Sequence, residues 1–134
     1  MGVESKFTEW MTPKRDRRAS LAPYFRKSPS LWEAAGLTSC ARLAADVHDG
    51  AEKFLHLDVP QLLKHSLGLK RAGAPSWTLM YLWFDPEGDS GETHREELAR
   101  FEQLVGQELG FKAATYQTLV LDLTRLAGQQ ANSA

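Results

Sequence analysis

The sequence predicts an α/β domain in which a sheet is covered by helices. The opening residues alternate with a period of two, which is typical of a β-strand: one face holds Val3, Ser5 and Phe7, and the other holds Glu4, Lys6 and Thr8. Residues 77–84 are almost continuously apolar and aromatic, and such a run is typical of a strand buried on both faces. Helical patterns lie between and after these segments, and strands that alternate with helices favour a layered α/β fold.

Three helices are expected between the two strands. The first covers residues 30–36 and opens with a capping-box pattern, and the second covers residues 38–49. The third begins with a cap near Asp58, holds Pro60 in its first turn and ends near residue 71. Its leucines form an apolar stripe, so this helix is expected to pack across the sheet.

Three more elements are predicted after the second strand. An amphipathic helix covers residues 90–109, a short strand covers residues 110–115, and a final helix covers residues 116–127. The buried stripe of the final helix is expected to consist of Leu119, Val120, Leu123 and Leu126. Residues 1–128 then form a single domain, and residues 129–134 form a disordered tail.

Composition places the chain among ordinary globular proteins. Of its 134 residues, 43% are hydrophobic and 25% are charged, and the net charge of −1 gives no global signal for nucleic acid. The single cysteine, Cys40, excludes an internal disulfide framework and fits a reducing compartment. Neither a secretory leader pattern nor an apolar run of membrane-spanning length is present in the sequence. A cytoplasmic protein without a membrane anchor is therefore expected.

Glu4 and Lys6 are the first candidates for chemistry. Residues i and i+2 of a strand share one face, so these two side chains are expected to project side by side. A carboxylate beside an ammonium can hold a hard divalent cation and stabilise a phosphate in the same cavity. The alternative is a solvated surface ion pair, which is the usual outcome for this common spacing.

Residues 2–9, with the sequence Gly-Val-Glu-Ser-Lys-Phe-Thr-Glu, resemble the Glu-x-Lys half-motif of the PD-(D/E)XK nuclease superfamily. Residues 57–69 and 77–85 resemble the matching parts of restriction-endonuclease-like members, and the resemblance extends to about Tyr116. It implies a restriction-endonuclease-like sheet flanked by helices and beginning at the Glu-x-Lys strand. The family places an Asp on a strand before this one, whereas only three residues precede Glu4. The chain is therefore expected to be the C-terminal part of a longer core.

The resemblance implies a Mg²⁺-dependent deoxyribonuclease that hydrolyses phosphodiester bonds. Glu4 would be the metal ligand, Lys6 would polarise the attacking water, and Gln61 would orient the site from its helix. Because the family's Asp is missing, Glu4 alone is expected to bind Mg²⁺ weakly, and this chain is expected to show little or no DNA cleavage. The alternative is a non-catalytic α/β interaction domain or a relic of the nuclease fold.

DNA is the expected partner. Residues 10–29 read as a long connection whose basic side chains would clamp a phosphate backbone, with Tyr24 and Phe25 nearby to stack a base. The residues expected to contact DNA are Lys14, Arg15, Arg17, Arg18, Lys64 and His65. A solvated loop and the polar flank of a helix are the alternatives for these residues. The sheet edge beside the opening strand would lack a partner, so a homodimer or another form of self-association is expected.

Overall fold

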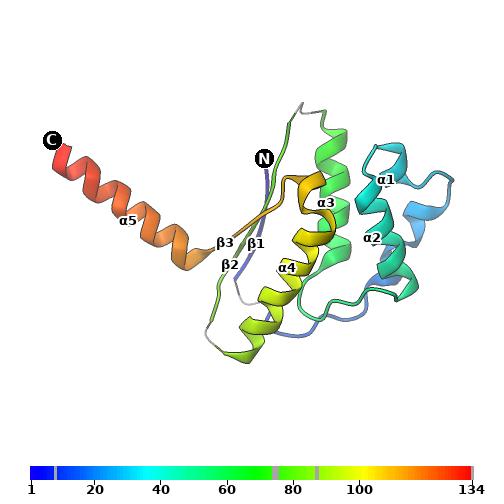
Figure 1. The fold of residues 1–134 in the computed structure, drawn as a ribbon, viewed down its shortest axis with the longest axis horizontal. Helices are drawn as coiled ribbons and strands as arrows, with labels where there is room; N and C mark the ends of the chain where they lie inside the picture. The colour runs from blue at the N-terminus through cyan, green and yellow to red at the C-terminus, as the bar shows by residue number, and fades with distance from the viewer. Residues whose placement is uncertain (8, 74–75, 87, 134) are drawn as a thin grey trace.

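The computed structural model describes residues 1–7, 9–73, 76–86 and 88–133 (Figure 1). In this part of the chain, three parallel strands form a sheet in the order β1 (Gly2–Lys6), β2 (Leu79–Trp83) and β3 (Lys112–Thr115). The strand predicted from the apolar run is therefore central, and the Glu-x-Lys strand lies next to it. Both predictions are confirmed, and the domain belongs to the α/β class.

Helices precede and follow the central strand much as the sequence predicts. They are the 3₁₀ helix η1 (Arg18–Phe25) and the α-helices α1 (Leu31–Ala34), α2 (Thr38–Asp49), α3 (Val59–Arg71), α4 (Asp89–Leu109) and α5 (Tyr116–Ser133). The helix η1 lies inside the segment that was expected to be a long connection. In Figure 1, α3 and α4 lie against one face of the sheet, and α1 and α2 form a further layer behind them.

Side chains cap these helices at their N-termini. Ser30 Oγ accepts a hydrogen bond from the Glu33 amide at 3.4 Å, and the Glu33 carboxylate accepts one from the Ser30 amide at 3.0 Å, which completes the predicted capping box. Asp58 caps α3 by accepting from the Gln61 amide at 3.2 Å. The cap of α2 comes from another helix, because Glu108 accepts from the amides of Ser39 and Cys40.

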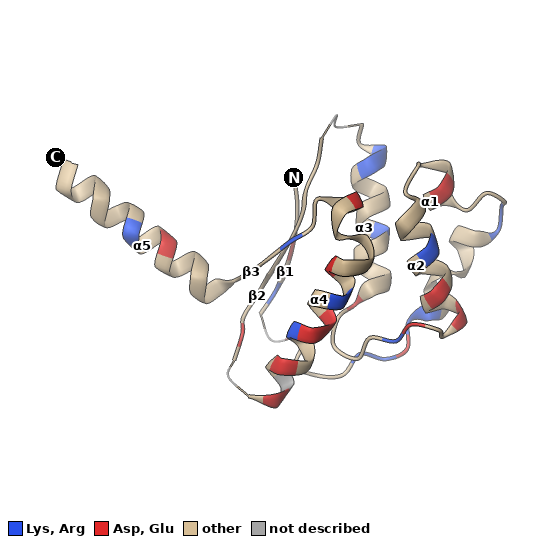
Figure 2. Ribbon diagram, in the orientation of Figure 1, with Lys and Arg blue, Asp and Glu red and all other residues tan. Residues whose placement is uncertain are grey.

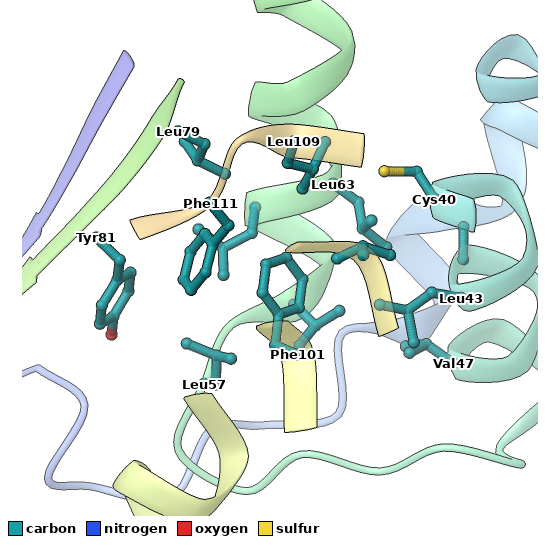
Figure 3. Close-up of a cluster of buried hydrophobic side chains, with 14 of the residues drawn as sticks. Cys40, Leu43, Val47, Leu57, Leu63, Leu79, Tyr81, Phe101, Leu109 and Phe111 are labelled. Atoms are coloured by element: carbon teal, nitrogen blue, oxygen red, sulfur yellow. The ribbon is translucent and has the colours of Figure 1, made fainter. Parts of the chain in front are cut away.

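The core lies between the sheet and the inner helices. Leu79, Tyr81 and Trp83 alternate along β2 and are buried on the side that faces α3 and α4. Figure 3 shows side chains from β2, α3, α4 and α2 meeting in this core, among them Leu63, Phe101 and Leu43.

The opposite face of the sheet is less covered than the sequence predicts. Met80 and Leu82 on β2 are half-buried, and Val3 on β1 is exposed. The prediction of a strand fully buried on both faces is therefore wrong for this second face. The physical reason is that, of the described helices, only the first residue of α5, Tyr116, reaches this face, while the rest of α5 extends away from it (Figure 1).

The final helix also differs from its prediction. No residue of α5 is buried within the described structure, and the stripe of Leu119, Val120, Leu123 and Leu126 is exposed. The helix continues to Ser133, so residues 129–133 are helical rather than disordered, and residue 134 lies outside the described residues. Among the described helices, none combines the length and the apolar character that crossing a membrane requires.

Candidate functional site

Glu4 and Lys6 project from β1 toward the helices. The side chain of Glu4 is 8% exposed, that of Lys6 is 17% exposed, and Lys6 Nζ lies 3.0 Å from Glu4 Oε1. The alternation of the strand brings them to one face, as the sequence predicts. Their burial excludes the solvated surface pair, because both groups have left bulk water.

Helix α3 supplies two further side chains to this pair. Gln61 Oε1 accepts a hydrogen bond from Lys6 Nζ at 3.3 Å. One turn later, His65 Nδ1 lies 2.7 Å from Glu4 Oε2. Residues four apart share a face of a helix, so α3 presents both groups to β1 at once. We refer to Glu4, Lys6, Gln61 and His65 as the Glu4 cluster.

Both oxygens of the Glu4 carboxylate have a nitrogen partner in this arrangement. Lys6 holds one oxygen and His65 holds the other. Burial of a carboxylate is costly unless it is paired and hydrogen-bonded, and these two contacts offset that cost.

A narrow gap, too small in this structure to hold a water molecule, adjoins the Glu4 cluster. Its lining includes Lys14, Asp58 and Tyr81 besides Glu4, Lys6 and Gln61. Tyr81 is the register partner of Glu4 on β2. Burial, together with the nearby negative charge of Glu4, raises the pKa of the Tyr81 hydroxyl well above its ordinary value. Tyr81 therefore keeps its proton, and its hydroxyl pairs with His94 Nε2 at 3.1 Å.

Lys14 connects this gap to a larger cleft, because its side chain lines both. Its Nζ donates a hydrogen bond to the Glu9 carbonyl at 2.7 Å. Burial, and after it the positive charge of Lys6, lowers the pKa of Lys14 from its ordinary value. Two lysines, Lys6 and Lys14, and two carboxylates, Glu4 and Asp58, thus line the same small gap.

The larger cleft has a volume of about 790 Å³ including its open mouth. Phe54, Val59 and Pro60 contribute to its apolar lining. Its basic side chains are Lys14, Arg15, Arg17, Arg18 and Lys53. Two of these guanidinium groups are held by carboxylates at 2.9 Å, Arg17 by Asp58 and Arg18 by Asp16. The predicted DNA contacts Lys14, Arg15, Arg17 and Arg18 are therefore brought together around one cleft.

Lys64 and His65 are separated although they are neighbours in the sequence. His65 points to Glu4, whereas Lys64 Nζ donates to Ser20 Oγ at 2.8 Å and lies 5.9 Å from the centroid of the Tyr24 ring. Lys64 therefore faces η1, away from the Glu4 cluster.

Tyr24 and Phe25 both contact Trp32. The Tyr24 ring stacks on Trp32 with centroids 5.0 Å apart, and the Phe25 ring contacts Trp32 at 5.6 Å. Both rings are half-buried against the core around α1, so the expectation that they stack a base stays a prediction. The aromatic residue at the cleft is Phe54, which the sequence reasoning assigned to no site.

Asp58 and Tyr81 are the other side chains that sequence reasoning did not assign to the site. Asp58 was predicted as the cap of α3, and Gln61 follows it by three residues. Residues three apart lie one helical turn apart, so Asp58 is expected near Gln61. This spacing was the signal in the sequence that could have placed Asp58 beside the site. The position of Tyr81 beside Glu4 depends on the register between β1 and β2, which cannot be read from the sequence.

The oxygen donors near Glu4 fit a magnesium ion only in part. Within the described residues, no group of three or more His, Cys, Asp or Glu side chains is placed to hold a metal ion. Glu4 is nevertheless a hard oxygen donor, and Asp58 lines the same gap. Both oxygens of Asp58 are engaged, one by the Gln61 amide and the other by Arg17. Glu4 is therefore the main oxygen donor at this place, and one carboxylate suits only weak binding of Mg²⁺.

Comparison of the chain with models of known protein families, with curated proteins and with solved structures gives no match. The similarity to the PD-(D/E)XK superfamily therefore rests on the motif residues and their order alone.

Proposed function

We propose that this chain is a metal-dependent DNA endonuclease-like domain of the restriction-endonuclease type, with Glu4, Lys6 and Gln61 at its hydrolytic centre. The observation that carries the proposal is the convergence of these three side chains in a buried cluster beside a basic cleft. The three residues are those that the resemblance to PD-(D/E)XK nucleases implies. The parallel strand pair of β1 and β2, joined through helices, agrees with that fold.

Glu4 would hold Mg²⁺ through its carboxylate, with waters and a substrate phosphate as the further ligands. When bound, the metal lowers the pKa of a coordinated water and offsets charge on the scissile phosphate. Lys6 would donate a hydrogen bond from Nζ to a phosphate oxygen, which stabilises the developing charge, or to the attacking water, which positions it. Gln61 positions Lys6, since its carbonyl oxygen accepts from Nζ at 3.3 Å.

The DNA strand would follow the cleft from Lys14 toward the arginines. Lys14 is shared by the cleft and the small gap, so a phosphate near Lys6 is continuous with a backbone bound in the cleft. Arg15 and Lys53 supply further positive charge. Neutralisation of phosphates by such side chains makes the affinity strongly dependent on salt.

The proposal is tested by plasmid nicking and DNA binding together. The chain is incubated with supercoiled plasmid in Mn²⁺ or Mg²⁺, beside the isosteric variant Glu4→Gln, the variant Lys6→Met and the control Glu96→Gln at an exposed position. Nicking is expected to be slow, because one carboxylate binds the metal weakly, and it should be lost in the first two variants only.

A binding measurement covers the case in which nicking is too slow to detect. Fluorescence anisotropy with a labelled duplex should show that Ca²⁺ tightens binding by the parent chain and by Glu96→Gln but not by Glu4→Gln. The Glu4 cluster would be structural if Glu4→Gln still nicked the plasmid. It would also be structural if the affinity for DNA were the same with and without Ca²⁺ and the same in Glu4→Gln as in the parent chain.

A second candidate is a non-catalytic interaction domain. The observation that favours it is the pairing of both Glu4 oxygens, one with Lys6 and one with His65, since neither oxygen is left open for a metal and the loss of one partner of a buried charge is destabilising. In that case Glu4→Gln lowers the stability of the fold and leaves DNA binding unchanged.

A further inference from the structure

The outer face of the sheet exposes apolar side chains, with Ser5 and Lys112 as its polar residues and Tyr116 of α5 hydrogen-bonded to Ser5. Val3 is 51% exposed, and its register partner Met80 and the next outward residue of β2, Leu82, are only half-buried. The four helices α1 to α4 lie on the other side (Figure 1). Parallel sheets occur almost only with both faces covered, so this face requires a second layer.

Helix α5 carries an apolar surface that nothing described covers. Leu119 is 39% exposed, and Leu123 and Leu126 are each 56% exposed. These three residues follow the i, i+4, i+7 spacing, so they lie on one face of the helix. Asp122 and Arg125 are the charged residues of α5, and Figure 2 shows the rest of the helix without charge. Isolated helices of this length are marginal in water, and packing of the apolar face normally stabilises them.

The first turn of α5 is fixed so that the helix points away from its own sheet. Gln117 forms two hydrogen bonds with the Asp85 backbone, donating to its carbonyl at 2.6 Å and accepting from its amide at 3.2 Å. Thr115 Oγ1 caps the helix by accepting from the Thr118 amide at 3.1 Å. The Tyr116 hydroxyl is hydrogen-bonded to Ser5. Since α5 begins directly after β3, folding it over the same sheet would break these contacts.

We propose that the outer face of the sheet is covered by α5 of a second copy of this chain, in a reciprocal twofold dimer. Each copy offers one open sheet face and one unpaired apolar helix, and such self-complementary surfaces close into an isologous pair. This surface is distinct from the edge of β1, at which the sequence predicted self-association.

The dimensions of the two surfaces agree. From Leu119 to Leu126 the helix rises by roughly 10 Å, which fits along a five-residue strand of about 17 Å. The part of α5 that lies along strands of this length covers roughly 170 Å² of a flat surface at a helix width of about 10 Å. Two reciprocal contacts remove about four such surfaces from water, roughly 700 Å², which is below the ~1,200 Å² of standard interfaces and in the range of small, weak ones.

The first test uses two leucines of α5 as a matched pair. Leu121 and Leu123 are 59% and 56% exposed, but Leu121 lies on the opposite side of the helix from the stripe. Sedimentation velocity of the parent chain at micromolar concentration should show a dimer. Leu123→Glu should weaken it by roughly a hundredfold, because a charge would be buried without a partner, and Leu121→Glu should leave it unchanged. A monomeric parent chain, or equal losses in both variants, overturns the proposal.

The second test identifies the surface that α5 covers. Chains with Val3→Cys are mixed with chains carrying Leu123→Cys and treated with a short bismaleimide. The native Cys40 is buried, and burial raises the pKa of its thiol, so it contributes little background. Crosslinked dimers that contain one chain of each kind are expected. A chain that carries both substitutions and crosslinks only within itself would show that α5 covers its own sheet. That result would overturn the proposal that α5 covers the sheet of a second copy.

Discussion

His65 Nδ1 lies 2.7 Å from Glu4 Oε2, and Lys6 Nζ lies 3.0 Å from Glu4 Oε1. The two oxygens of this carboxylate are therefore paired with side chains from two different elements, α3 and β1. A buried carboxylate with two nitrogen partners is well compensated in the absence of a metal. Any cation that binds Glu4 must share or displace one of these contacts. His65 is the more replaceable partner, because its side chain is 47% exposed while that of Lys6 is 17% exposed.

Removal of His65 is therefore expected to strengthen metal binding. His65→Ala frees one oxygen of Glu4 and should tighten Mn²⁺ binding by roughly fivefold, the equivalent of ~1 kcal/mol for a partly exposed contact with a charged group. Titration calorimetry or the electron paramagnetic resonance signal of free Mn²⁺ measures the change. His48→Ala is the matched control, since His48 pairs with Asp49 on the exposed side of α2 and should not alter the affinity. Weaker binding in His65→Ala would show that the imidazole is itself a ligand.

The buried His94 predicts that the fold loses stability in acid. Burial, and to a lesser extent the charges of His56 and Lys14, lowers the pKa of His94 from 6.5 to about 3. The unfolded chain then binds one more proton than the folded chain between these two pH values. The stabilising contribution is complete above pH ~6.5 and falls by about 1.4 kcal/mol per pH unit as the pH decreases through that window.

Urea unfolding at several pH values measures this contribution. Between pH 7.5 and pH 5 the free energy of unfolding should decrease by about 2 kcal/mol from this residue. His94→Gln retains a polar group beside Tyr81 and removes the titration, so its stability should vary less over the same range. An identical pH dependence in both proteins would mean that other groups control the acid response.

The order of strands and helices could be predicted because its signals are local. The capping box at Ser30 and the cap at Asp58 lie within four residues of the amides that they satisfy. The cap of α2 could not be found in this way, because Glu108 reaches it from another helix. The exposure of α5 was missed for the same reason. An amphipathic pattern states which face is apolar, but the surface that covers it can belong to a distant part of the chain or to another chain.

The candidate site could be predicted to the extent that it follows the periods of single elements. The period of two in β1 joins Glu4 to Lys6. The resemblance to nucleases added Gln61, which contacts Lys6. The contact of His65 with Glu4 depends on how α3 is placed across β1, which only the folded structure contains. The same limit applies to Trp10, which is fully buried on His94 although the sequence assigns it to a loop.

Glu97 of α4 is expected to be the residue on which the start of α3 depends. Its carboxylate accepts hydrogen bonds from the amides of His56 at 2.9 Å and Leu57 at 2.7 Å, and also from the amide of Leu55. These amides precede the Asp58 cap, so Glu97 fixes the segment from which α3 enters the site.

Glu97→Ala should lower the free energy of unfolding by about 2 to 3 kcal/mol, because partly buried amides lose their acceptor. Glu97→Gln should lie between the parent chain and Glu97→Ala, since its amide group retains one acceptor oxygen. The control is Glu96→Ala at the neighbouring exposed position, which should stay within about 0.5 kcal/mol of the parent chain. Urea unfolding at neutral pH measures all four proteins. Equal stability of Glu97→Ala and Glu96→Ala would show that water replaces the carboxylate at these amides, and α3 would then be held by its packing alone.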